Sequence, residues 1–163
     1  MKTYKTVLPV ALVLAIAGFA AYTFLSRKPP VHTSTGDVLL TDNNGTAIDG
    51  YDVVAYFTEG SPTEGTDEYT VEHDGATWKF ASAKNRDAFL TDPSRYIPQY
   101  GGFCAWAISE KKTLIHSDPH AWKIVNDKLY LNVNQDVRSV WVDNQAEFIR
   151  KGDANWPDVQ QSA

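Results

Sequence analysis

The chain has 163 residues, of which 43% are hydrophobic and 21% are charged, so it has room for one compact domain and a short extension. Its formal net charge is -5, with 15 Lys and Arg residues against 20 Asp and Glu residues. Because the chain has no basic cluster that could neutralise phosphates, this balance argues against nucleic-acid binding.

Residues 1–28 have the pattern of a membrane anchor or a signal peptide. Lys2 and Lys5 precede an uncharged, mostly apolar run from Thr6 to Leu25. About 20 apolar residues are enough for a helix to cross the hydrocarbon core, whereas the apolar part of a signal peptide usually has about 7–15. We therefore expect a retained anchor, with the rest of the chain on the periplasmic or extracellular face of the inner or plasma membrane. A signal peptide cleaved after Ala20 is the alternative.

The segment that follows predicts the domain organisation. Residues 29–45 contain two prolines followed by small polar residues, a composition typical of a linker. We expect the folded domain to run from residue 46 to residue 157, with residues 158–163 as a short tail.

Two pairs of segments have the pattern of β-hairpins. Glu68 to His73 and Ala76 to Phe80 alternate in polarity on either side of Asp74-Gly75, and Asp-Gly in this setting is a strong hairpin signal. Trp122 to Val125 and Lys128 to Asn132 form the second pair. The sequence therefore predicts two hairpins that contribute to a small antiparallel sheet.

Helices are expected at three places. Ser82 is a good N-cap for a helix that ends at Leu90, and Asp92-Pro93 starts another short turn of helix. A longer helix is expected from Gln135 to Lys151, with these apolar residues on one face: Val137, Val140, Trp141 and Phe148. Hairpins and helices in separate blocks indicate an α+β fold, with the hairpins packed on helices and the anchor or signal helix in front.

Several motifs, in matching order and spacing, resemble the YHS domain. They are found at Ile48 to Phe57, Glu72 to Tyr96, Pro98 to Trp106 and Lys128 to Asn132. The last two are similar to the larger, exported branch of that family. The resemblance covers residues 46–157 and implies a relation to the metal-binding domains of copper-transport ATPases and other metal-handling proteins.

The same resemblance shows that the usual metal ligands are missing. Cysteine-bearing YHS domains hold soft metals through cysteines at three positions, which align with Ala55, Ala81 and Asn85 of this chain. Alanine has no donor atom in its side chain, and asparagine is a weak ligand for a soft ion. Metal binding therefore cannot be inherited from the family, and other residues would have to supply the ligands.

Cys104 is the only cysteine of the chain and follows Gly101-Gly102 among aromatic residues. The two glycines predict a turn or a close approach of another segment. Cys104 is expected near the start of a helix, which would lower the pKa of its thiol and make it a soft ligand for Cu(I). A buried, inert cysteine is the equally weighted alternative.

His116 and His120 form an H-x-x-x-H pattern, but Asp118-Pro119 lies between them. Because proline fits the first turn of a helix, we expect His120 in such a turn and His116 outside it. The pair either binds a metal ion or lies solvated on the surface. Asp52 is a fourth candidate ligand, with hydrogen bonding to the backbone of a turn as its alternative role.

The sequence contains no G-x-S-x-G, H-E-x-x-H or C-x-x-C motif and no phosphate-binding glycine loop, so we expect no enzymatic activity. One hypothesis is an exported, tethered protein that stores, senses or delivers a transition metal, copper before zinc. Cys104 would be the main ligand, with His116 and His120 as second choices, joined by Asp52 or by groups from a second copy of the chain. The other hypothesis is a metal-free module for a protein partner or a small ligand, in which the family's metal site has decayed.

Overall fold

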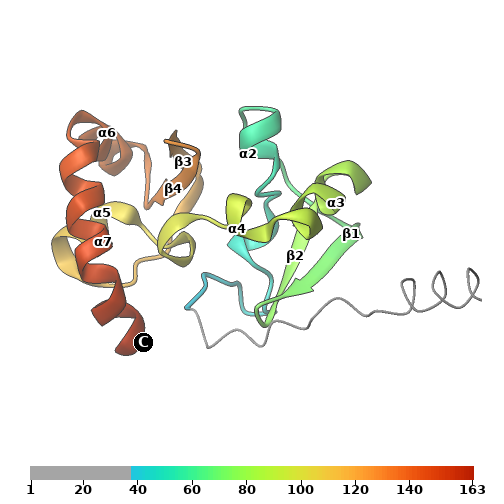
Figure 1. The fold of residues 1–163 in the computed structure, drawn as a ribbon, viewed down its shortest axis with the longest axis horizontal. Coiled ribbons are helices and arrows are strands. Elements are labelled where there is room, and N and C mark those ends of the chain that lie inside the picture. Colours follow the sequence, from blue (N-terminus) through green and yellow to red (C-terminus); the bar gives the residue numbers. More distant parts are fainter. Residues whose placement is uncertain (1–37) are drawn as a thin grey trace, which may run out of the picture. The chain divides into compact units, whose positions relative to one another are not determined.

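The computed structural model describes residues 38–163, and Figure 1 shows the fold as a ribbon. The expected anchor at residues 1–28 and most of the expected linker lie outside the described residues. Within the described part, no helix has the length and apolar character needed to cross a membrane.

Hairpins and short helices occupy separate blocks of residues 38–163, which confirms the α+β expectation. The strands form two separate two-stranded antiparallel sheets, one for each hairpin, rather than a single small sheet. In chain order the elements are η2 (Ile48–Gly50), α2 (Ala55–Thr58), β1 (Thr66–His73), β2 (Ala76–Phe80), α3 (Ala83–Thr91), α4 (Pro93–Tyr96), η3 (Gln99–Gly102), α5 (Ala105–Lys111), β3 (Asp118–Val125), β4 (Lys128–Asn132), α6 (Gln135–Asp143) and α7 (Gln145–Gln161).

β1 and β2 meet in the turn predicted from Asp74-Gly75. The two residues have φ of 51° and 76°, the left-handed conformation that a tight hairpin turn needs and that glycine adopts at no steric cost. On the buried face of β2, Trp78 and Phe80 pack against Phe89 of α3, with ring centroids 5.0 and 5.1 Å from the Phe89 ring. These rings belong to the first of two hydrophobic clusters in the described residues.

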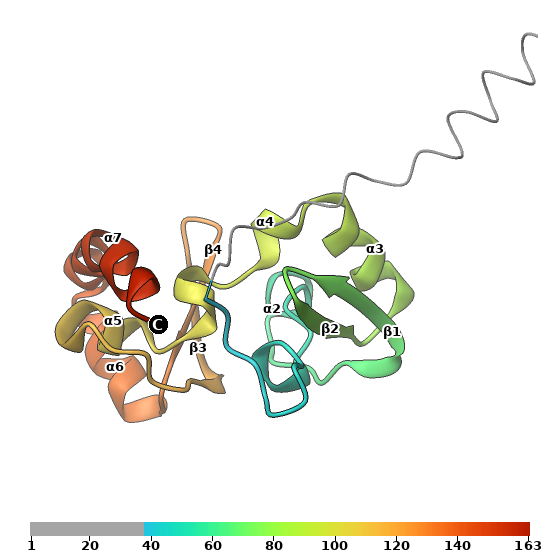
Figure 2. The same cartoon turned by 90° about the horizontal axis from the view of Figure 1, so that it is seen from below.

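The second hairpin lies between the two clusters. β3 and β4 meet at Asn126-Asp127, whose φ values are 50° and 58°. Leu129 and Leu131 of β4 belong to the first cluster, whereas Tyr130 belongs to the second and packs 5.1 Å from Trp141 of α6. Successive strand residues point to opposite faces, so β4 contributes to both clusters. Figure 2 shows this hairpin between α2 on one side and the helices α5 and α6 on the other.

The single helix predicted over residues 135–151 is wrong, because the chain forms α6 and α7 there. Asn144 has φ -138° and ψ 42°, which interrupts the helix, and α7 then continues past the domain boundary expected at residue 157. Val140 is 54% exposed, whereas the adjacent Trp141 is fully buried. Consecutive helical residues point about 100° apart, so Val140 does not share the buried face as expected.

Gly101 and Gly102 are the place where the start of the described chain packs against η3. The Leu40 N–H donates to the Gly101 carbonyl oxygen at 2.8 Å. A Cβ on Gly101 would overlap the Val38 carbonyl, and a Cβ on Gly102 would overlap the Ile48 side chain. The close approach predicted from the glycine pair is therefore confirmed. Leu40 is itself buried, so the packed core begins before residue 46, where the sequence suggested the domain boundary.

Candidate functional site

The Asp52 carboxylate is fully buried and accepts four hydrogen bonds, an arrangement that we call the Asp52 centre. Its Oδ1 accepts from the backbone N–H groups of Val54 at 2.9 Å and Ala55 at 3.2 Å. Its Oδ2 accepts from the backbone N–H of Ala81 at 2.9 Å and from Nδ2 of Asn85 at 2.7 Å. A carboxylate offers about four lone-pair positions, so these donors fill its accepting capacity.

Local structure explains why these donors are available. Ala55 begins α2, and the first N–H groups of a helix have no partner within it. Ala81 follows the last residue of β2. Asn85 lies in the first turn of α3, where its own backbone N–H donates to Oγ of the predicted N-cap Ser82 at 3.2 Å.

Ala55, Ala81 and Asn85 are the positions at which the resemblance to the YHS domain expects cysteine ligands. The fold gathers all three around the Asp52 carboxylate, and each of them supplies an N–H donor. A metal ion needs lone pairs from its ligands, and those of Asp52 are already taken by hydrogen bonds. The geometry therefore does not fit the expected role of Asp52 as a metal ligand, and it matches the alternative role of bonding to backbone.

Cys104 immediately precedes α5 and is fully buried. Burial raises the pKa of the Cys104 thiol, and this effect outweighs the lowering by the backbone N–H groups of Ala107, Val133 and Trp106. The sequence suggested a lowered pKa at a helix start; the shift is in the other direction because a buried thiolate loses its solvation. Cys104 is a neutral, enclosed thiol in this structure, as its alternative reading expected.

Asn132, at the end of β4, is a buried polar residue that the sequence analysis did not single out. Its Oδ1 accepts from the Trp106 N–H at 3.2 Å and lies 3.8 Å from Sγ of Cys104. Its Nδ2 has no hydrogen-bond partner within residues 38–163. The only signal in the sequence is an asparagine directly after the apolar run Leu129 to Leu131.

His116 and His120 both lie against the short segment formed by η2 and the residue after it. Nε2 of His116 is 2.7 Å from Oδ2 of Asp49, and Nε2 of His120 is 3.2 Å from the hydroxyl oxygen of Tyr51. The Tyr51 and His120 rings meet edge to face, with centroids 5.6 Å apart. We call Asp49, Tyr51, His116 and His120 the histidine surface, since both imidazoles are exposed.

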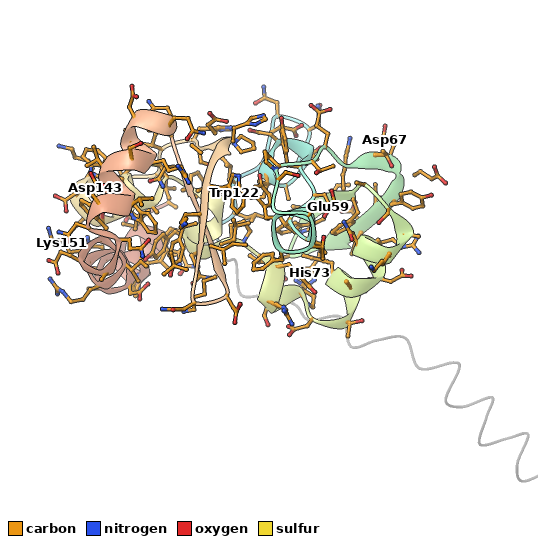
Figure 3. The ribbon with its side chains drawn as sticks, turned by 90° about the horizontal axis from the view of Figure 1, so that it is seen from above. Glu59, Asp67, His73, Trp122, Asp143 and Lys151 are labelled. Carbon is orange, nitrogen blue, oxygen red and sulfur yellow. The ribbon has the colours of Figure 1, made fainter. Side chains whose placement is uncertain are left out.

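The structure corrects the local conformation predicted for His120. The sequence expected Asp118-Pro119 to start a helix, but these residues are the first two of strand β3, and His120 is the third. Proline is also tolerated at the start of a strand, where its missing N–H costs little. β3 is held against α2 because the Tyr56 hydroxyl donates to the Pro119 carbonyl at 2.9 Å and Trp122 packs edge to face on Tyr56 at 5.2 Å. Figure 3 labels Trp122 on this hairpin.

The η2 turn, which contributes Asp49 to the histidine surface, has a strained backbone. Ile48, Asp49 and Gly50 have φ of 50°, 53° and 82°, and positive φ is unfavourable for a β-branched residue such as isoleucine. Ile48 is fully buried in the first cluster, which holds it in this conformation, whereas Asp49 is exposed. The buried Ile48 side chain therefore fixes the turn in place, and the Asp49 carboxylate lies against His116.

Negative charges surround Tyr51 in the histidine surface. Partial burial and the charges of Glu64, Asp118 and Asp49 raise the pKa of the Tyr51 phenol. The hydroxyl therefore stays protonated near neutral pH and can either donate to Nε2 of His120 or accept from it.

The four residues predicted as metal ligands occupy three different places. Asp52 lies in the Asp52 centre, Cys104 precedes α5, and His116 and His120 share the histidine surface. Over residues 38–163, no three or more His, Cys, Asp or Glu side chains are grouped so that they could hold a metal ion. Of the predicted set, only His116 and His120 lie against the same short segment, through Asp49 and Tyr51.

Comparison with known proteins identifies one family. The model of the YHS domain matches residues 54–100, a shorter stretch than the 46–157 expected from the motifs. The match runs from the residue before α2 into η3, so the Asp52 centre lies at its edge, and His116 and His120 lie beyond it. Neither the comparison with curated proteins nor the comparison with solved structures gave a match. The chain therefore contains a YHS domain, a family associated with metal binding, at residues 54–100.

Proposed function

We propose that this protein is exported, tethered to a membrane by residues 1–28, and binds a transition-metal ion at the histidine surface for storage, sensing or delivery. The observation that carries the proposal is the pair of exposed imidazoles that lie against η2 and the residue after it, each with a hydrogen-bond partner there. The YHS domain match contributes only the family's association with metal binding, because His116 and His120 lie beyond the matched residues 54–100.

The hydrogen bond of His116 fixes which of its nitrogens is available. The Asp49 carboxylate can only accept, so Nε2 of His116 carries the proton and Nδ1 of the neutral ring keeps its lone pair. A histidine that binds metal commonly donates its other ring N–H to a carboxylate in this way, which raises its basicity as a ligand. Asp49 is therefore a supporting residue in the proposal rather than a ligand.

His120 completes the pair. In the metal-binding tautomer its Nε2–H donates to the Tyr51 oxygen, and Nδ1 has no hydrogen-bond partner among residues 38–163. Two imidazoles leave further coordination positions for water or for groups from a second copy of the chain or a protein partner. Among the common divalent ions, nitrogen ligands bind Cu²⁺ most tightly, so copper is the proposed ion, with zinc next.

Cys104 has no part in the proposed site. A soft metal needs the thiolate, and burial raises the pKa of this thiol and keeps it neutral. The proposed ligands are therefore His116 and His120, and not Cys104, which the sequence favoured. Because its role is binding without turnover, we expect no catalytic activity from the protein.

Calorimetric titration of the detergent-solubilised full-length chain with Cu²⁺ and Zn²⁺ tests the proposal. We expect one Cu²⁺ per chain with a dissociation constant of about 1 μM, or about 8 kcal/mol of binding free energy. The double variant His116→Ala, His120→Ala should bind at least about tenfold more weakly, a loss of about 1.4 kcal/mol. His73→Ala is the matched control, because this histidine pairs with Asp74 in the first hairpin.

Binding by the double variant equal to that of the wild type would contradict the proposal. So would binding that disappears in Cys104→Ser but survives in the double variant. If neither ion binds at micromolar concentration, the metal-free module for a protein partner or small ligand becomes the better account.

A further inference from the structure

We propose that in this chain the Asp52 carboxylate takes the structural place that a metal ion would have in the YHS domain. The Asp52 centre is separate from the histidine surface, and metal binding at that surface does not bear on it. A family associated with metal binding is present, yet the residues gathered around Asp52 provide hydrogen-bond donors for an anion.

The Asp52 centre connects three parts of the chain. Through Oδ1, Asp52 bonds to the start of α2, and through Oδ2 it bonds to Ala81 at the end of β2 and to Asn85 in α3. Ala81 and Asn85 are far from Asp52 in sequence, so these bonds fix the α2 segment on the first hairpin and its helix. A structural metal ion does the same when it draws ligands from separate segments.

The charge of this centre is the opposite of that of a metal site. In a metal site a cation lies at the middle and lone pairs point towards it; here an anion lies at the middle and N–H groups point towards it. A buried charge is costly unless it is paired or hydrogen-bonded. No Lys, Arg or His side chain within residues 38–163 forms an ion pair with Asp52, so the four N–H donors provide its compensation.

A cation cannot enter this centre without breaking it. To coordinate a metal, Asp52 would have to give up hydrogen bonds, and the N–H groups of Ala81 and Asn85 would lose the acceptor that they have in this structure. Only the Ala55 N–H would keep a partner, the backbone carbonyl of Asp52 at 3.2 Å. The methyl side chains of Ala55 and Ala81 offer no replacement ligand. The structure therefore points to a YHS domain whose folding does not depend on metal at this position.

Thermal unfolding of the detergent-solubilised full-length chain tests this, with and without EDTA. The experiment uses the His116→Ala, His120→Ala background, so that metal at the histidine surface does not contribute. We expect the unfolding midpoint to be unchanged by EDTA. Adding Asp52→Asn should lower it by about 10 °C, because two buried N–H donors then face an amide NH₂ group. Asp67→Asn, at an exposed ion pair with Lys79, is the control and should shift it by about 2 °C or less.

If Asp52→Asn does not fold, hydrogen–deuterium exchange of the wild-type chain provides a second test. Peptides covering residues 52–58 and 80–86 should exchange slowly, and EDTA should not change their rates. A metal ion released in stoichiometric amount on denaturation of the double-histidine background would overturn the inference. So would faster exchange of these peptides in EDTA, or an Asp52→Asn variant as stable as the control.

Discussion

The substitution Asn85→Asp tests the charge of the Asp52 centre most severely, because it changes a hydrogen-bond donor into a second carboxylate. Nδ2 of Asn85 is 2.7 Å from Oδ2 of Asp52, so an oxygen would replace the donor at hydrogen-bond distance. Asp52 is fully buried, and Asn85 is buried as well. The two carboxylates would have little solvent to separate their charges.

The size of the effect follows from two contributions. Two unit charges about 4 Å apart repel by about 4 kcal/mol at an effective dielectric constant of 20. Loss of a hydrogen bond to a charged group adds about 1.5–3 kcal/mol. With both carboxylates ionised, the penalty is about 5–7 kcal/mol, comparable with the whole unfolding free energy of an ordinary domain, about 5–15 kcal/mol.

The penalty should depend on pH, because one shared proton removes most of it. In the folded Asn85→Asp variant the neighbouring charge and burial raise the pKa of one carboxyl of the pair. A group whose folded pKa is raised contributes stability below its unfolded pKa, about 4, and that stability is lost as pH rises through the folded value. The variant should therefore be close to Asn85→Ala in stability near pH 4 and far below it at pH 8.

Urea unfolding at a series of pH values between 4 and 8 measures this difference. Asn85→Ala is the matched control, because it removes the same donor without adding a charge. A stability gap between the two variants that stays below about 1 kcal/mol at pH 8, or that does not change with pH, would refute the reasoning.

Two further predictions concern the thiol and the N-terminus. Because burial raises the pKa of Cys104, the native chain should react with a thiol reagent at least about 100-fold more slowly than the urea-unfolded chain at pH 8; equal rates would mean an accessible thiol. If residues 1–28 are a retained anchor, mass spectrometry of protein recovered from membranes should show the full-length chain. A soluble form beginning near Ala21 would instead identify a cleaved signal peptide.

Features set by neighbouring residues could be predicted from the sequence. Asp74-Gly75 specified the first hairpin turn, and Ser82 capped α3 as expected. The Gly101-Gly102 pair correctly indicated a close approach, although not that the approaching segment is the one before η2. Each of these features depends on backbone conformations that few residue types favour.

Features set by distant residues could not be predicted. The pairing of His116 with Asp49 and the bonds from Ala81 and Asn85 to Asp52 depend on how separate elements pack, which residue types alone do not encode. The sequence therefore indicated His116 and His120 as candidate ligands. It suggested Asp52, rather than Asp49, as the carboxylate beside them. The break at Asn144 was missed because asparagine also occurs inside helices, and only packing decides whether it interrupts one.

X-ray absorption at the copper edge tests the proposed metal site most directly, because it identifies the atoms bound to the ion. The sample is the full-length chain with one equivalent of Cu²⁺. The proposal predicts a first shell of nitrogen and oxygen with the multiple scattering of imidazole, and loss of that imidazole signal in the His116→Ala, His120→Ala variant. A sulfur shell from Cys104, or an imidazole signal unchanged in the double variant, would contradict it.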